Sequence, residues 1–571
     1  MSAPNNNPPG SKPEMSMEMR LLLAFALMGI VLFVTPYFFK SVMPPAPPKK
    51  SQTAAQQKEI PAAASPSAPA APVTEEETAP AAAPVNAQKE ETFVVDTDLY
   101  NVVFSNRGAV VQKWVLKKYT DENGKPLELV NTAAIAKVGF PFELGFEDKK
   151  PPVDLNHALF LPKPDADGLG ITYEYAEGAV TAHKTFRFQR NKYLTQISTE
   201  VRDHGARLPH LIEWRGGFGD PSATNPNDQH SIRFDLNDAK LVTLDAKSAK
   251  NGPVTSEGNF SFAGIEDKYF AAVFLPSGPS SLKLVTLSDP VPTVANTGRE
   301  DPHVGIGVGA GSYDLSAFVG PKDIDVLNHV NPQLTKIVDY GWFTFLAKPL
   351  FLALHYVNDK WVRNYGWSII IVTIFINFLL FPLKLSNLKS MKKMQALQPL
   401  VQVINDKYKG ISMRDPRAQQ KNEELMALYK KHGANPMGGC LPMAIQIPFF
   451  IAFYKVLYVS IELRHAGWLW VSDLSSAEQL PIHVLPILMI GTQFWLQKMT
   501  PTTSVDPNQQ RMMLFMPLIM GFFFYSLPSG LVLYYLTANL VGIAQQWFFN
   551  KTVTVADIPQ PVPAGKKQSK R

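Results

Sequence analysis

Long apolar runs lie in two separated parts of the chain. The first run, 19–39, is about long enough to cross a bilayer as a helix. It ends in bulky aromatic residues rather than the small residues of a cleavage site, so we expect an uncleaved anchor. The other five runs lie near the C-terminus, and several are shorter than the roughly 20 residues that a bilayer requires. They are 366–383, 438–459, 482–497, 512–526 and 531–549.

Between these two parts the pattern changes to short alternating runs. Runs such as 92–95, separated by turn formers such as Asn123-Gly124, are typical of strands joined by hairpins. Their repetition across 92–340 predicts one large antiparallel β-sandwich domain. The glycine-rich stretch 305–311 is not clearly followed by the helix that a nucleotide-binding loop requires, so we expect a strand bent at its glycines.

Three other segments complete the plan. Residues 40–91 are rich in Pro and Ala and predict an extended tether. Residues 341–362 are aromatic and amphipathic, which favours a helix lying on the membrane surface. The segment 384–436 is predicted to form a helical hairpin, because Asp415-Pro416 supplies a capping oxygen and a preset backbone angle.

The charge distribution sets the expected orientation. Residues 384–436 contain eleven Lys or Arg against four Asp or Glu, and the tail 551–571 is also basic. By the positive-inside rule both are cytoplasmic, as is the segment 1–18. The connection 460–481 has Arg464 as its one basic residue against three acidic residues and is expected on the other side. The chain is thus predicted to be an α-helical membrane protein with six spans, 363–550 containing five of them, and its β domain outside.

Recognisable catalytic motifs are absent from the sequence. It contains no Walker-type phosphate loop, no H-E-x-x-H and no G-x-S-x-G. The single cysteine, Cys440, excludes an intramolecular disulfide and argues against a cysteine-based zinc site. We therefore expect neither an enzyme nor a cofactor or metal.

Polar side chains within the apolar runs form the candidate site. A polar group in hydrocarbon must find a partner or line a wet cavity. Spacings of four and seven residues place one set on a single face of the second span and another on a single face of the last span. The sets are Thr373, Asn377 and Lys384, and Tyr535, Asn539 and Gln546; Gln446, Lys455, Thr492, Gln493 and Gln497 add to them from the third and fourth spans. Converging sets predict a hydrophilic groove, and the alternative is that each side chain only bonds a neighbouring helix.

The basic hairpin is a second candidate surface. Its charge suits lipid head groups, ribosomal RNA or nascent chains, and the alternative is a solvated hairpin that simply obeys the positive-inside rule. The candidate contact residues are Lys384, Lys389, Lys392, Lys393, Lys407 and Lys409.

Several motifs together resemble the YidC/Oxa/Alb family of membrane protein insertases. They are Asn435-Pro436-Met437-Gly438-Gly439-Cys440-Leu441-Pro442, Gln446-Ile447-Pro448, Pro501-Thr502-Thr503, Asp506-Pro507 and Leu527-Pro528-Ser529-Gly530-Leu531-Val532-Leu533-Tyr534-Tyr535. The resemblance is dense over about 342–550, and the order of anchor, tether and outer domain is similar to the Gram-negative form. It implies an inner-membrane protein with a five-helix insertase core, a groove open to cytoplasm and lipid, a mobile cytoplasmic hairpin and a periplasmic β-supersandwich.

The resemblance also implies a function and partners. Members insert, fold and assemble inner-membrane proteins, alone or with the Sec translocon and its accessory subunits, and contact nascent chains, lipids and, transiently, the ribosome, but not DNA. One position departs from the family pattern, because the arginine usually found four residues after the span-two threonine is Asn377 here. We hypothesise that Lys384 or Lys455 supplies the missing charge.

Two other functions stay open. A solute transporter or channel is the main alternative, since intramembrane polar residues also mark solute paths; the sequence shows no inverted repeat and no acidic relay to favour it. Carbohydrate binding by the outer sandwich is a second, by analogy with the similar mutarotase-like architecture, but a fold does not establish a function.

Overall fold

The computed structural model describes residues 84–147, 149–220, 228–277, 281–292, 300–310, 314–410, 415–434, 441–500 and 507–552. The predicted anchor at 19–39, most of the tether, Cys440 and the tail beyond 552 lie outside these ranges. Nearly all of the described residues belong to one compact unit, Glu77–Thr503 with Leu514–Arg571. The exception is the beginning of one helix, 507–513, which belongs to the other unit.

The first part of this unit is a β domain of three sheets, in which every pairing between strands is antiparallel. The largest sheet has the order β13 (Lys240–Leu244), β12 (His230–Asp235), β15 (Phe260–Glu266), β16 (Phe270–Pro276), β19 (Asp314–Pro321), β9 (Leu194–Asp203), β8 (Val180–Phe188), β7 (Gly170–Glu177) and β6 (Leu161–Pro164), with β10 (Ala206–Arg207) beside β9. A second sheet runs β14 (Val254–Gly258), β17 (Leu282–Pro292), β18 (Glu300–Ala310), β11 (Leu211–Trp214) and β5 (Glu143–Gly145). The third runs β1 (Thr92–Asp96), β2 (Tyr100–Ser105), β3 (Val110–Thr120) and β4 (Pro126–Glu128).

The period of two seen in the sequence explains these strands. Along β8 the side chains alternate strictly between buried and more exposed positions, as expected for a strand with one face on the core. The glycines of β18 have a packing reason, because a methyl group on Gly307 or Gly309 would come within 3.0 or 2.8 Å of Leu211 on the paired strand β11. The prediction of a glycine-containing strand over this stretch is confirmed for residues 305–310.

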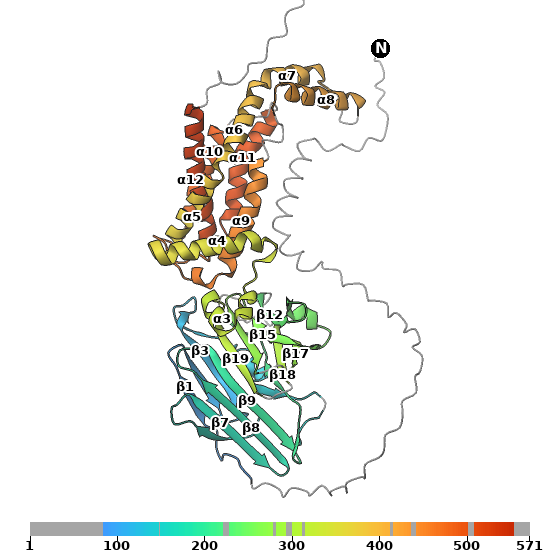
Figure 1. Cartoon of the computed structure of the whole chain (residues 1–571), viewed down its shortest axis with the longest axis vertical. Helices are drawn as coiled ribbons and strands as arrows, with labels where there is room; N and C mark the ends of the chain where they lie inside the picture. Colours follow the sequence, from blue (N-terminus) through green and yellow to red (C-terminus); the bar gives the residue numbers. More distant parts are fainter. Residues whose placement is uncertain are drawn as a thin grey trace, which may run out of the picture. The chain divides into compact units, whose positions relative to one another are not determined.

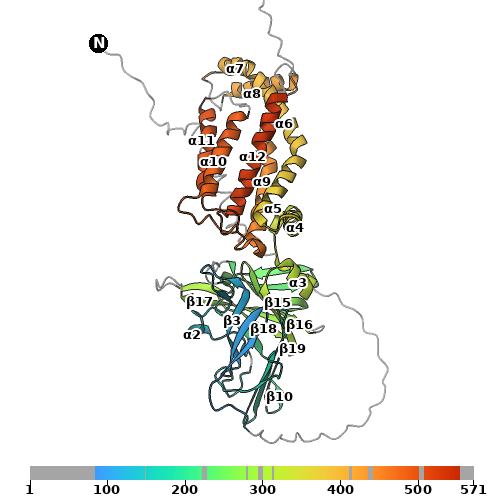
Figure 2. The same ribbon diagram turned by 90° about the vertical axis from the view of Figure 1, so that its left-hand side faces the viewer.

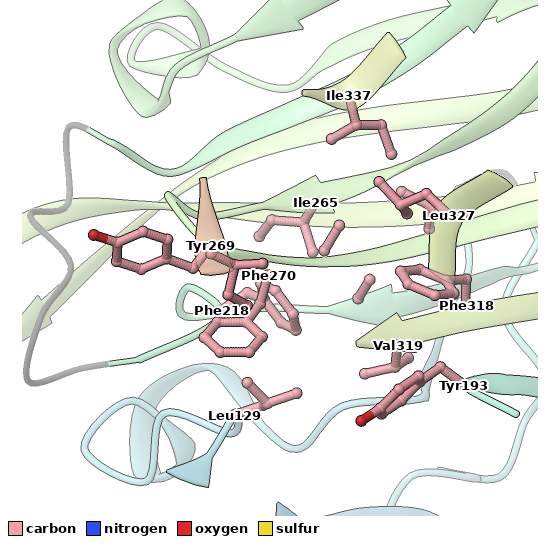
Figure 3. Close-up of a cluster of buried hydrophobic side chains, with 14 of the residues drawn as sticks. Leu129, Tyr193, Phe218, Ile265, Tyr269, Phe270, Phe318, Val319, Leu327 and Ile337 are labelled. Carbon is pink, nitrogen blue, oxygen red and sulfur yellow. The ribbon is translucent and has the colours of Figure 1, made fainter. Parts of the chain in front are cut away.

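Aromatic rings fill the core of the β domain. Trp114 lies within 6.3 Å of Tyr100, Phe142 and Trp214, measured between ring centroids. Figure 3 shows another part of this core, in which Phe218 and Phe270 face Leu129. Two short elements lie between strands, the helix α2 (Ile135–Val138) and the 3-10 helix η2 (Ala246–Ala249). Two more follow the last strand, the helix α3 (Ile324–Val330) and the 3-10 helix η3 (Pro332–Ile337).

The second part of the unit is helical. It begins with η4 (Gly341–Phe343), α4 (Thr344–Val357) and the π-helical turn η5 (Asn358–Val362). There follow α5 (Tyr365–Leu379), α6 (Phe381–Ala396), α7 (Gln398–Lys407), α8 (Pro416–Lys431), α9 (Leu441–Val459), η7 (Ile461–Leu463), α10 (Val484–Met499), α11 (Pro507–Phe524) and α12 (Ser529–Thr552). Figure 1 and Figure 2 both show α12 beside α10, and α7 beside α8.

Two features of these helices bear on the site. The predicted helix start at Asp415 is confirmed, because its side chain accepts from Arg417 N at 2.9 Å and caps α8. Within the described ranges no single helix is both long and apolar enough to cross a bilayer. One pair meets both conditions together, Gly341–Val362 followed by Tyr365–Leu379, with a bend of 117° between them.

Candidate functional site

Helix α12 carries more buried polar side chains than any other helix in the described part of the helical core. It contacts α5, α9 and α10, so that its polar residues face three different neighbours. Thr537, Asn539, Gln545 and Gln546 are all at most 8% exposed. Some of the predicted site residues lie in three polar contacts along α12.

The first contact joins α5, α6 and α12 around Asn377. The Asn377 side chain donates to Thr373 O at 2.8 Å and accepts from Lys384 Nζ at 2.6 Å. Its backbone carbonyl accepts from Gln545 Nε2 at 3.0 Å. Thr373 Oγ1 and Gln545 Oε1 are buried without a hydrogen-bond partner among the residues that the structure describes. The structure thus brings Thr373, Asn377 and Lys384 together, as the spacing predicts.

The second contact joins α9 and α12. Gln446 Nε2 donates to Tyr534 Oη at 3.0 Å, and the Tyr534 ring is stacked on Phe453 with centroids 4.3 Å apart. The predicted residue Tyr535 lies in an aromatic group instead, with its ring centroid 5.0 Å from Phe524 and 6.3 Å from Phe450.

The third contact joins α10 and α12. Asn539 Nδ2 lies 3.4 Å from both Met489 O and Thr492 Oγ1, which are long hydrogen bonds. Gln493 Oε1 is buried without a partner within the described part of the chain. Asn539 of α12 is therefore bonded to α10 rather than to the Asn377 group.

The candidate lysines are spread over the helices of 381–434. Lys389 and Lys409 are exposed, and Lys393 is half-buried. Lys392 Nζ lies 5.1 Å from the centre of the Phe549 ring, and Lys407 pairs with Glu424 between α7 and α8. Lys455 is on α9, where a methyl group on Gly341 would come within 4.0 Å of its Cε. Of the two predicted charge substitutes, only Lys384 reaches Asn377.

Large apolar side chains are exposed on α5, α10 and α11. Phe375, Phe378 and Trp495 are 67%, 64% and 61% exposed, and Phe522 is 79% exposed. Helices that bury amides and expose phenylalanines suit an apolar surrounding, because contiguous exposed apolar surface is rare on a protein in water.

Comparison with known families agrees with this division of the chain. Residues 92–353 match the model of the YidC periplasmic domain, and residues 357–556 match the model described as 60Kd inner membrane protein. The chain belongs to the YidC family. The β domain is the periplasmic domain of this family, and α4 to α12 include its C-terminal helical core.

Relatives within the YidC family extend over almost the whole chain. A protein of Syntrophus aciditrophicus named Membrane protein insertase YidC is 35% identical over 562 residues, covering 94% of this chain and 100% of the relative. A protein of the same name from Geotalea daltonii is 34% identical, with 94% and 100% covered. A solved structure titled as an active YidC insertase shows a weak likeness, with 19% identity and a TM-score of 0.35, covering 81% of this chain and 93% of that one.

Two residues that make contacts between helices were not predicted from the sequence. Gln545 and Tyr534 make the contacts to α5 and α9, whereas the spacing rule selects their neighbours Gln546 and Tyr535. Gln546 instead donates to Asn550 Oδ1 at 3.0 Å within α12. The sequence does offer one signal for these two residues, because each is adjacent in the chain to a predicted residue of the same type.

Proposed function

We propose that this chain is a membrane protein insertase and chaperone. It inserts, folds and assembles inner-membrane proteins, and the polar groups inside its helical core contact the inserting chain. What supports it is family membership together with the Asn377 group. Insertion of this kind is not a catalytic reaction, in agreement with the absence of catalytic motifs in the sequence.

The single observation that carries the mechanism is a pair of buried oxygens beside Asn377, Thr373 Oγ1 and Gln545 Oε1. Neither has a hydrogen-bond partner within the described residues. A buried polar group without a partner costs about 1–3 kcal/mol, more where the surroundings are hydrocarbon. A hydrophilic segment of a client chain, or water carried with it, lowers that cost by bonding to these atoms. The polar groups thereby reduce the cost of bringing the segment part-way into the bilayer. Burial of the client's apolar span then releases it into lipid.

Lys384 gives the proposed groove a preference for acidic clients. Its ammonium is bonded to Asn377 Oδ1, so a positive charge stands where polar groups of α5 and α12 meet. A carboxylate on the client would replace the Asn377 amide as the hydrogen-bond partner of Lys384. The new bond would join two charged groups, and charge-assisted hydrogen bonds are about twice as strong as neutral ones. Lys455 lies on α9 near Gly341 and is the weaker candidate.

The remaining features belong to the same proposal. Both termini are cytoplasmic, six spans cross the inner membrane, and the β domain lies in the periplasm. The basic hairpin formed by α7 and α8 contacts nascent chains, lipids and the ribosome. The Sec translocon is a partner for larger clients. The domain limits proposed from the sequence, with the amphipathic segment 341–362 at the interface, complete this arrangement.

Photocrosslinking during translation tests the function directly. A photoreactive residue at 377, 446 or 535 in the full chain should give adducts with a short nascent membrane protein. A matched probe at the exposed position Phe522 should give lipid adducts instead. A chain that crosslinks no nascent protein from any inner position, yet moves a solute in proteoliposomes, would be a transporter.

The charge preference is tested by separate substitutions. Lys384→Gln should lower insertion of an acidic-tailed client several-fold and leave a neutral-tailed client unchanged. Lys455→Gln is the matched control and should insert both clients normally. Equal insertion of both clients by both variants contradicts the assignment.

A further inference from the structure

The 460–481 loop, which connects α9 to α10, is bonded mainly to itself and to the helices around it. Asp473 Oδ1 accepts from His465 N at 3.1 Å and from Ser475 N at 2.8 Å. Glu478 accepts from Trp470 Nε1 at 2.8 Å and from Leu485 N, in the first turn of α10, at 2.9 Å. The two carboxylates are therefore used to fold the loop and to cap a helix.

The same loop holds the first turns of two other helices. Asn364, the N-cap of α5, donates from Nδ2 to Gly467 O at 2.9 Å. At α12, Ser529 N donates to Ser476 O at 2.7 Å and Gly530 N donates to Leu474 O at 2.9 Å. These are backbone amides at a helix N-terminus, which have no partner inside the helix. The loop thus connects the beginnings of α5, α10 and α12.

The contacts are close enough to fix the spacing of these helices. A methyl group on Gly366 would come within 2.2 Å of the Trp468 ring, and one on Gly530 would come within 3.0 Å of Leu474 O. Because the loop approaches both helices this closely, a displacement of the loop changes the packing of α5 and α12.

One side chain of the loop leaves it for the β domain. The Arg464 side chain is 4% exposed and pairs with Asp220, which is fully buried. The guanidinium also donates to Thr120 O at 2.8 Å and lies 5.6 Å from the ring centres of Tyr269 and Phe270. Asp220 is itself held in place, because its backbone amide donates to Asp267 Oδ2 at 3.0 Å.

We propose that the Arg464–Asp220 ion pair lets the β domain position the 460–481 loop, and through it the starts of α5, α10 and α12. Removing one partner of a buried pair leaves an uncompensated charge, which disfavours the docked arrangement strongly. Arg464 is therefore a positioning residue for the helical core. The β domain thus holds the beginnings of these helices in position. This positioning does not depend on the proposed function.

Hydrogen exchange on the full chain in detergent tests the positioning. In Arg464→Met the amide hydrogens of Ser529 and Gly530 should exchange at least about tenfold faster than in the unmodified chain, because their acceptors belong to the loop. Asp220→Asn should give a similar increase. Exchange in the double variant should be no faster than in either single variant, since both substitutions remove the same ion pair. Unchanged exchange in Arg464→Met, or effects that add in the double variant, would overturn the proposal.

Two controls keep the result interpretable. Arg187→Met breaks an exposed pair with Asp165 on the β domain and should leave the exchange at 529 and 530 unchanged. Protection of the amides of β8 and β9 reports whether the β domain is folded. If Arg464→Met loses this protection, Arg464→Lys decides, because it keeps the charge and should restore slow exchange at least in part.

Insertion by the same variants separates this inference from the proposed function. In Arg464→Met, crosslinking of a client to position 377 should persist, while the protected, translocated part of the client decreases several-fold. Arg464→Lys should recover part of that loss. If the unmodified chain gives neither crosslink nor protected client, the proposed function fails and the exchange result stands by itself. If Arg464→Met gives both at unmodified levels, positioning by Arg464 has no bearing on insertion and that part of the inference fails.

Discussion

The β domain and the helical core differ in how many large apolar side chains they expose. Among the described residues the β domain exposes Val94, Leu161 and Leu236, whereas the helical part exposes many, Phe375 and Phe522 among them. In the β domain, Trp114 and Trp214 are buried and lie against other rings, whereas in the helical core Phe375 and Trp495 point outward and Asn377 is inside. Water drives apolar side chains inward, but a lipid tail is as apolar as phenylalanine and provides no such drive. In the proposed arrangement water surrounds the β domain and lipid surrounds the helical core, so a substitution should have effects that depend on which region holds it.

The largest expected effect is on the core of the β domain. Trp114→Ala removes a ring that contacts Tyr100, Phe142 and Phe188, and should lower the free energy of unfolding by about 3–5 kcal/mol. Denaturant unfolding of the full chain, followed by hydrogen exchange in β2 and β3, measures the change. Val94→Ala, at an exposed position on β1, is the control and should change stability by less than about 0.5 kcal/mol.

An acidic side chain on the exterior of the helical core tests whether lipid surrounds that exterior. Phe375→Asp should cost about 2.5–3.5 kcal/mol, the range for an acidic side chain inside a bilayer. The fraction of chain recovered folded from membranes measures the loss. Val94→Asp is at a similarly exposed position, 57% against 67% for Phe375, but on the β domain, and should be close to neutral. Similar small effects at the two positions would contradict the comparison.

Buried charge in the β domain gives a pH-dependent prediction. Lys184 Nζ donates to the carbonyl oxygens of Gly108 and Phe142 at 2.7 and 2.9 Å, and burial lowers its pKa from 10.5 to about 7. Above pH 7 the unfolded chain keeps the proton that the folded chain has lost. The free energy of unfolding therefore rises with pH between 7 and about 10, by up to about 1.4 kcal/mol per unit. Below pH 7 both states are protonated and this dependence disappears.

The measurement compares variants across that pH range. Lys184→Met should lack this rise in denaturant unfolding of the full chain, and the exposed control Lys118→Met should keep it. The same rise in Lys184→Met would show that another group causes it.

The smallest effect on stability is expected inside the helical core. Gln545→Leu removes one hydrogen bond and one unpartnered oxygen, so the free energy of unfolding should change by less than about 1 kcal/mol. Insertion should nevertheless fall several-fold, because a polar partner for the client is lost. Gln546→Leu, one residue further along, should insert normally. Equal insertion by both variants would favour polar residues that only hold helices together.

The coarse architecture could be predicted because each region repeats its pattern many times. Alternation across strands such as β8 indicated a β domain, and apolar runs with few charges indicated a helical core. Both are confirmed. Even the stretch 305–310 could be assigned, since the sequence after it does not clearly start the helix of a nucleotide-binding loop; the next described element is the strand β19.

The site could be predicted less well because spacing does not fix the rotation of a helix. Adjacent residues on an α-helix point about 100° apart. Whether Gln545 or Gln546 faces α5, and whether Tyr534 or Tyr535 faces α9, is decided by packing between helices. Lys384 is a simpler case, because it lies seven residues from Asn377 and any helical path brings the two to one face.

The distance along the chain between Asp220 and Arg464 has a consequence for the order of assembly. The two residues are 244 positions apart. At about 5–20 residues per second, a ribosome needs roughly 10–50 s to reach the arginine after the aspartate has been made. Within that interval the ribosome completes the last described strand of the β domain, which ends at Pro321. The loop that carries Arg464 is therefore synthesised after all the described strands of the β domain, so the ion pair joins two parts of the chain that are made at different times.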